Sequence, residues 1–151
     1  MIAPMQRKIV GVTPPAAIVD NAAVTTTEID TIGYAYAVIN VYMGATDIAP
    51  TTLKVTESDT SGSGHADITA SVFGTAVNDT GSASTLPSAT DDNKIYSFFV
   101  DLRGRKRYLD LSLTGGDGTL GGYFCCWAEL WRAQDAPLTA VQAGYAQRMV
   151  F

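Results

Sequence analysis

The sequence predicts an all-β protein made of two antiparallel β-sheets packed face to face. Short segments alternate between two sets of side chains, and Val, Ile, Tyr, Phe and Thr dominate them. Clusters of Gly, Ser, Asp and Pro separate these segments, and no window has the period of an amphipathic helix. With 151 residues, of which 46% are hydrophobic, the chain is long enough to bury a core within a single domain.

The first half of the chain contains three clear alternating segments and two weaker ones. Tyr34 to Met43 carries its aliphatic residues on the face that should point to the core, and its tyrosines on the other face. The alternation predicts strands with one solvent-exposed face over Thr52 to Ser58 and Asp67 to Phe73. Lys8 to Val12 and Thr25 to Ile32 are weaker strand candidates.

Two polar stretches are predicted to be loops. Glu57 to His65 is polar and glycine-containing, which favours a hairpin connection. Asn78 to Asn93 offers little apolar surface to offset the entropy cost of ordering it. We expect a long, mobile loop there.

The second half contains the clearest strands. Lys94 to Leu102 and Arg107 to Thr114 each place large apolar side chains on one face, and Tyr123 to Arg132 is apolar on both faces. Together the segments give roughly seven or eight strands separated by turns, which is typical of a jelly roll or a related sandwich. We expect Greek-key connections rather than a simple meander.

Composition and motifs argue against catalysis. The formal net charge is -5, and the chain has 1 His and 2 Cys, so it lacks the material for a zinc cluster or a disulfide framework. Ser63, His65 and Asp67 are the residue types of a hydrolase triad, but their spacing within a turn does not predict the relay geometry. The acidic groups match no calcium-binding repeat. We therefore predict no enzyme activity, no cofactor and no metal site.

The two cysteines and the N-terminal region bear on the cellular compartment. Cys125 and Cys126 are neighbours in a predicted strand, where successive side chains point to opposite faces, so a bond between them would distort the backbone. Reduced cysteines suit a protein made in a reducing cytosol. No apolar run has the length of a membrane span, and no association with a membrane is expected.

One basic run stands out in this acidic chain. Between two predicted strands, the sequence RGRKR reads as a tight hairpin turn around Gly104 with a compact positive tip, formed by Arg103, Arg105, Lys106 and Arg107. We expect a protein partner there rather than nucleic acid, because the rest of the molecule would repel a polyanion. The equally favoured alternative is a solvated turn, or internal ion pairing with Asp101 and Asp110.

Aromatic residues and apolar termini indicate an interface. Large rings lie opposite the predicted core face of two strands, at Tyr36, Tyr42, Trp127 and Trp131. A terminal segment of the same chain is an equally favoured cover for them. Residues 1–24 and 134–151 are rich in apolar residues and proline and end on Val150 and Phe151, so we expect extended arms around a sandwich of residues 25–133.

Two segments carry a resemblance to a known class of protein: YAVINVYMGATDIAPTTLKVTESDTSGSGHADIT and IYSFFVDLRGRKRYLDLSLTGGDG. Their succession of strands and turns resembles the jelly-roll capsid cement, or head decoration, proteins of tailed bacteriophages. The resemblance implies a non-enzymatic virion protein, made in the host cytoplasm. It would bind the outside of the head across subunits of the major capsid protein.

Self-association and one other class of function remain open. A cement role favours a homo-oligomer, a dimer before a trimer, in which the sandwich makes the contact. The alternative is a carbohydrate- or receptor-binding sandwich of a tail fibre or an adhesin, in which the rings at positions 36, 42, 127 and 131 form a stacking platform.

Overall fold

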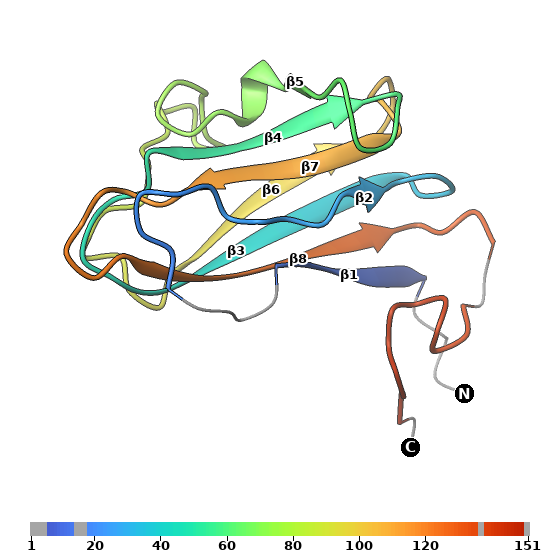
Figure 1. Ribbon diagram of the computed structural model, residues 1–151. Coiled ribbons are helices and arrows are strands. Elements are labelled where there is room, and N and C mark those ends of the chain that lie inside the picture. The colour runs from blue at the N-terminus through green and yellow to red at the C-terminus, as the bar shows by residue number, and fades with distance from the viewer. Residues whose placement is uncertain (1–5, 14–17, 136–137, 150–151) are drawn as a thin grey trace.

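The computed structural model describes residues 6–13, 18–135 and 138–149, and it confirms the two-sheet antiparallel β-sandwich (Figure 1). Sheet A has the strand order β1-β8-β3-β6, and sheet B has the order β2-β7-β4-β5. A single short 3-10 helix, η1, is found in the described part of the chain. The strands are β1 (Arg7–Thr13), β2 (Ile29–Asp30), β3 (Tyr36–Thr46), β4 (Thr52–Ser58), β5 (Ala66–Asp67), β6 (Ile95–Asp101), β7 (Tyr108–Thr114) and β8 (Gly122–Trp131).

The strand pairing is that of an eight-stranded jelly roll. Along the chain the first strand pairs with the last, the second with the seventh, the third with the sixth and the fourth with the fifth, and all of these pairs are antiparallel. This pattern results when one long hairpin is wound so that successive strand pairs fall alternately in sheet A and sheet B. The Greek-key expectation is therefore confirmed.

The core is formed by the strand faces that the alternation of apolar and polar residues predicted to be buried. Sheet A contributes Ile39, Met43 and Leu130, and sheet B contributes Leu109 and Leu111, all fully buried. Cys126 is buried in the same core, while Cys125 lies on the opposite face of β8, and both are free thiols. Burial raises the pKa of the Cys126 thiol to about 12, so it stays protonated and behaves as a small apolar side chain.

The segment after β4 differs from the expected strand. The hairpin expected over residues 57–65 is present and connects β4 to β5, but β5 has only two residues. η1 (Thr69–Ser71) then follows. The Ser71 hydroxyl accepts the Val55 N–H at 3.0 Å and donates to the Val55 carbonyl at 2.9 Å, in place of the strand pairing expected for residues 67–73. The prediction of a strand from Asp67 to Phe73 is therefore wrong beyond its first residue.

The N-terminal region belongs to the sandwich instead of forming an arm up to residue 24. β1 pairs with β8, and residues 18–24 run along the side of the sandwich. Val19 bridges to Gly122 of sheet A, while Ala23 bridges to Thr114 of sheet B. Val12 is part of the core, and Val19 and Val24 pack against it, so side chains before residue 25 contribute to the packing of the sandwich.

The C-terminal extension folds back on β1. The Ile9 N–H, at the outer edge of sheet A, donates to the Ala143 carbonyl at 2.9 Å, and Leu138 and Ala143 are buried. The described chain continues below β1 in Figure 1, and the Arg148 guanidinium donates to the Leu138 carbonyl at 3.2 Å. Val150 and Phe151, proposed from sequence as contact residues, lie outside the described residues.

The basic run does not form a hairpin. β6 belongs to sheet A and β7 to sheet B, so residues 102–107 cross from one sheet to the other. The Arg105 N–H donates to the Leu102 carbonyl at 3.1 Å and closes a turn at this crossing. Alternation along two strands carries no information about whether they lie in the same sheet, which explains the wrong hairpin.

Candidate functional site

The main candidate site is the outer face of sheet A, which points away from the core. Side chains of a strand alternate between its two faces, so this surface follows from the register of the four strands. All four rings selected from sequence lie on it. Its larger apolar members are Ile9, Tyr36, Val38, Tyr42, Ile95, Phe99, Tyr123, Trp127 and Trp131.

The rings on this face differ in exposure. Tyr36 and Trp131 are cross-strand partners, and Trp131 is 38% exposed. Tyr42 is 37% exposed, whereas Tyr36 and Trp127 are partly buried. The most exposed ring is Phe99 of β6, at 82%, and it lies beside Val38.

Phe99 was missed from the sequence. The sequence prediction for this strand rested on its inward residues, whereas Phe99 lies on the opposite face. The signal that identified the tyrosines of β3 also applies here, because Ile95 and Phe99 are large apolar residues at alternate positions of a strand. Both are exposed in the structure, which extends the apolar surface to the edge of sheet A.

Two rings of the outer face are held by arginines. The Arg7 guanidinium lies 5.3 Å from the centre of the Trp131 ring, and the Arg132 guanidinium lies 5.4 Å from the Tyr36 ring. Arg7 also forms an ion pair with Glu129 at 2.8 Å. A sugar stacking on these two rings would compete with the guanidinium groups, so the arrangement favours a protein partner over a carbohydrate.

The basic run is neutralised by carboxylates of the same chain. Arg103 pairs with Asp101 at 2.5 Å, Arg105 with Glu57 at 3.4 Å, Lys106 with Asp59 at 3.9 Å and Arg107 with Asp30 at 2.7 Å. Pairing with Asp101 was expected as one alternative, but Asp110 instead accepts a hydrogen bond from the Thr26 hydroxyl at 2.7 Å. The predicted positive tip is thus a set of ion pairs in which each basic side chain has an acidic partner.

Arg107 makes both a bidentate ion pair and a contact with an aromatic ring. Its Nε and Nη2 groups donate to the two carboxylate oxygens of Asp30 at 2.8 and 2.7 Å. This hydrogen bonding holds the pKa of Asp30 below its usual value and raises the pKa of Arg107. The guanidinium also stacks on the Tyr108 ring at 4.8 Å. A bidentate, stacked arginine links β2 to β7 and has little capacity left for an external phosphate.

The residues of the apparent triad point to different partners. His65 Nε2 lies 3.1 Å from a carboxylate oxygen of Glu28, and Asp67 pairs with Lys54 at 2.7 Å. The contact of Ser63 is through its backbone carbonyl, which accepts a hydrogen bond from the Ser58 hydroxyl at 2.5 Å. The structure therefore assembles no Ser-His-Asp relay from these residues.

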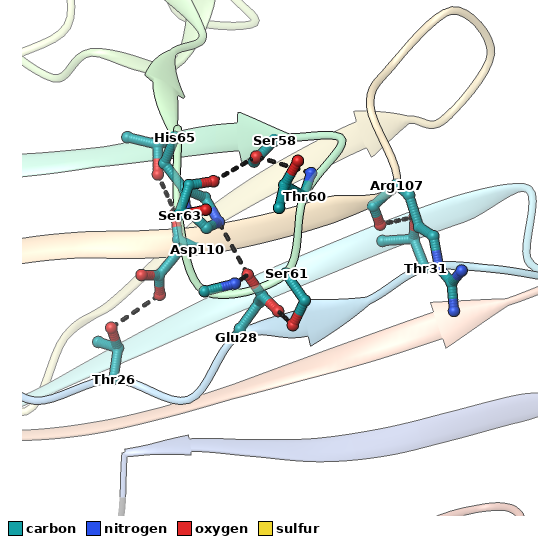
Figure 2. Close-up of polar contacts among 12 residues, drawn as sticks. Thr26, Glu28, Thr31, Ser58, Thr60, Ser61, Ser63, His65, Arg107 and Asp110 are labelled. Carbon is teal, nitrogen blue, oxygen red and sulfur yellow. Dashed lines mark hydrogen bonds and ion pairs between the residues drawn. The ribbon is translucent and has the colours of Figure 1, made fainter.

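Glu28 organises this turn, as Figure 2 shows. Its carboxylate accepts the Ser61 hydroxyl at 2.6 Å and the Gly62 N–H at 2.8 Å. These hydrogen bonds hold the pKa of Glu28 below its usual value. Ser61 and His65 both contact the carboxylate of Glu28. The cluster therefore holds the β4–β5 hairpin against the segment before β2 and does not activate a serine as a nucleophile.

Among the described residues, no three His, Cys, Asp or Glu side chains gather closely enough to hold a metal ion. Over the same residues, no helix has the length and apolar character that crossing a bilayer requires.

Comparisons with protein-family models, with curated proteins and with solved structures find no match to this chain. The fold and the outer face of sheet A are therefore the basis for a functional proposal.

Proposed function

We propose that this protein is a non-enzymatic structural protein of a tailed-bacteriophage particle. In this role it is a cement, or decoration, protein on the outer surface of the head. It binds across subunits of the major capsid protein and stabilises the shell by covering surface that the shell alone leaves exposed. The resemblance of residues 33–133 to jelly-roll cement proteins suggests this role.

The observation that carries the proposal is the apolar outer face of sheet A. Phe99, Ile95, Tyr123, Trp131 and Tyr42 are all exposed there, although the core inside the sandwich is complete. Clusters of exposed rings outside a finished core are typical of protein interfaces. A standard interface buries about 800 Å² on each partner, an area of the order that one face of a four-stranded sheet presents.

Self-association forms part of the proposal, with a dimer favoured over a trimer because two-fold contacts are the commonest among homo-oligomers. A carbohydrate- or receptor-binding sandwich of a fibre or adhesin is the second candidate. The exposed rings of Tyr42 and Trp131 favour it, since jelly rolls also occur among lectin domains. The arginines over Trp131 and Tyr36 argue against it.

The deciding experiment locates the polypeptide and measures its binding. Phage particles from a culture that expresses the chain from its native genome are purified, and its copy number relative to the major shell protein is measured by quantitative mass spectrometry. We expect many copies per head, and heads stripped of the protein should rupture at lower temperature until it is added back. A few copies at the tail, together with binding on a glycan array, would support the second candidate. Absence from every particle would reject both.

A double variant connects this test to the proposed surface. Phe99→Ser with Trp131→Ser removes two exposed rings from the outer face and should weaken binding to stripped heads at least tenfold. Leu120→Ser is the matched control, because Leu120 is an exposed apolar residue in the loop before β8. Equal binding by the double variant and the control would show that another surface contacts the shell.

A further inference from the structure

Within the described residues, no strand pairs with the outer edge of β6. β6 pairs only with β3, and in an antiparallel pair successive residues alternate between facing the partner and facing away. The Met43 N–H donates to the Lys94 carbonyl at 2.9 Å, and the Leu102 N–H donates to the Ala35 carbonyl at 3.1 Å. The even-numbered residues of β6 therefore face β3, and the outward N–H and C=O groups belong to Ile95, Ser97, Phe99 and Asp101.

The other sheet edges in the described part of the chain are short or covered. β2 and β5, at the edges of sheet B, have two residues each. β1, at the opposite edge of sheet A, has an irregular register after Gly11 and is capped at Ile9 by the carbonyl of Ala143. β6 has seven residues, a regular register and neither proline nor lysine. Natural proteins rarely leave such an edge bare.

A groove runs along this bare edge. Residues 68–84 face β6 across a cleft of about 640 Å³, whose apolar lining includes Ile68, Phe73 and Val77. The Phe73 ring packs edge-on against Tyr96 and Phe98, at centroid distances of 5.8 and 5.2 Å, which fixes the inner wall. An open strand edge beside an apolar cleft is the arrangement that binds an added strand, since the edge supplies hydrogen bonds and the cleft takes alternate side chains.

We propose that this groove binds residues 146–151 of a second copy of the chain, which add to β6 as a strand. The segment, AQRMVF, places Gln147, Met149 and Phe151 on one side of an extended strand and Ala146, Arg148 and Val150 on the other. Met149 is 79% exposed in the single molecule. Six extended residues span about 20 Å, close to the length of β6.

The positions and charges of the two parts support this occupant. The described part of the segment, residues 146–149, lies next to β1 of its own molecule, where the Arg148 guanidinium donates to the Leu138 carbonyl at 3.2 Å. The groove lies at β6, the opposite edge of the same sheet (Figure 1). Each molecule would therefore donate its segment at one edge and accept a segment at the other, a head-to-tail contact. Arg148 is the only charged residue of the segment. The groove is lined by Asp79, Asp101 and Arg105, and Asp79 is the carboxylate there for which no ion pair is found among the described residues.

Two full-length variants separate the donor from the acceptor. Met149→Asp alters only the segment. Phe99→Pro removes the outward N–H of residue 99 in β6 and leaves the backbone groups that face β3 in place. Proline is tolerated on the exposed side of edge strands. Sedimentation of the wild type should show head-to-tail association, and each variant alone should associate at least tenfold more weakly. Phe99→Ala and Met149→Leu are controls that retain the edge N–H and the apolar side chain, respectively.

The mixture of the two variants provides the sharpest result. Phe99→Pro still carries an intact segment and Met149→Asp an intact groove, so a 1:1 mixture should form dimers and no larger species. In wild-type oligomers, amide exchange at Ser97 and Phe99 should slow at least tenfold relative to dilute protein. Thermal melting of each variant shows whether it is folded.

Several results would overturn the inference. They are a monomeric wild type at millimolar concentration, a mixture that stays monomeric, or a folded Met149→Asp variant that associates like the wild type. The inference rests on the proposed function only in that copies associate: it replaces the two-fold dimer favoured there with a head-to-tail contact. The two therefore fail differently. Monomers that still bind heads would refute the groove contact and leave the cement role intact.

Discussion

At the scale of single residues, the carboxylate of Asp91 organises the turn that leads into β6. It accepts the Ser88 N–H at 2.7 Å, the Ser88 hydroxyl at 3.0 Å and the Tyr96 hydroxyl at 2.9 Å, and it pairs with Lys94. The bond from Lys94 contributes most to holding the pKa of Asp91 well below its usual value. Burial, together with the bond to Asp91, raises the pKa of Tyr96 to about 12.

These contacts predict how Asp91 affects stability as the pH changes. Its folded pKa lies below the unfolded value, so its contribution is complete above about pH 4 and decreases as the pH falls through the folded pKa. Asp91→Asn should therefore lower the free energy of unfolding at pH 7, and its difference from the wild type should shrink below pH 4. Denaturant titrations at both pH values test this.

The control for this prediction is Asp117→Asn. Asp117 is exposed, and no hydrogen bond to its side chain is found among the described residues. Its substitution should leave the free energy of unfolding within about 0.5 kcal/mol of the wild type. A difference between wild type and Asp91→Asn that stays constant down to pH 2 would mean that the charge of Asp91 is not what stabilises the turn.

At the scale of elements, the docking of residues 138–145 on β1 depends on Gly144. This glycine has φ +83°, and a Cβ added there would lie 1.9 Å from the Ile9 carbonyl oxygen. Gly144→Ala should therefore release the segment, lower the free energy of unfolding by more than about 2 kcal/mol and speed amide exchange at Ile9.

Gly33→Ala is a control with the same backbone angle. Gly33 also has φ +83°, but a Cβ there would meet no atom within 4 Å. Its cost should be the conformational term alone, about 1–2 kcal/mol, with no change in exchange at Ile9. Equal effects of the two substitutions would mean that the close approach to β1 contributes nothing.

Alternation predicted the longer strands because each has one face on the core. β3, β4, β6, β7 and β8 were placed within a few residues, and their inward apolar side chains are buried in the core or, as for Tyr96 and Val100 of β6, partly buried against it. The rings of the candidate surface followed from the same rule, applied to the other face of β3 and β8. Alternation of apolar and polar residues reflects the burial of one face of a strand. It therefore predicts the strands whose position is determined by packing on the core.

The failures have a common physical cause. In the segment after β5, the Ser71 hydroxyl bonds to the Val55 backbone, and such a side-chain substitute for strand pairing has no period. The basic run was assigned to a hairpin because two strands flank it, yet its carboxylate partners come from distant positions such as Asp30 and Glu57. Contacts between distant residues depend on the winding of the chain, which local patterns do not encode.

At the scale of the whole molecule, the jelly-roll winding brings the first and last strands together. β1 pairs with β8 from Arg7 to Thr13, and β8 in turn pairs with β3 in the middle of sheet A. Residues 138–145 then cover the outer edge of β1. The two ends of the described chain thus close the same side of the sandwich, so neither end can be removed as if it were a free arm.

Deleting residues 1–13 tests this closure. The deletion removes the ladder with β8 and the buried Val12, and it leaves the C-terminal segment without its docking edge. Full burial of one Val is worth about 1.5–3 kcal/mol, a large part of a typical stability of about 5–15 kcal/mol. We expect the shortened chain to lose cooperative thermal unfolding or to aggregate through the bared edge of β8.

Deletion of residues 1–5, which keeps β1 whole, is the control. If the longer deletion melts as the full chain does, the pairing of residues 7–13 with β8 contributes little to the stability of the sandwich.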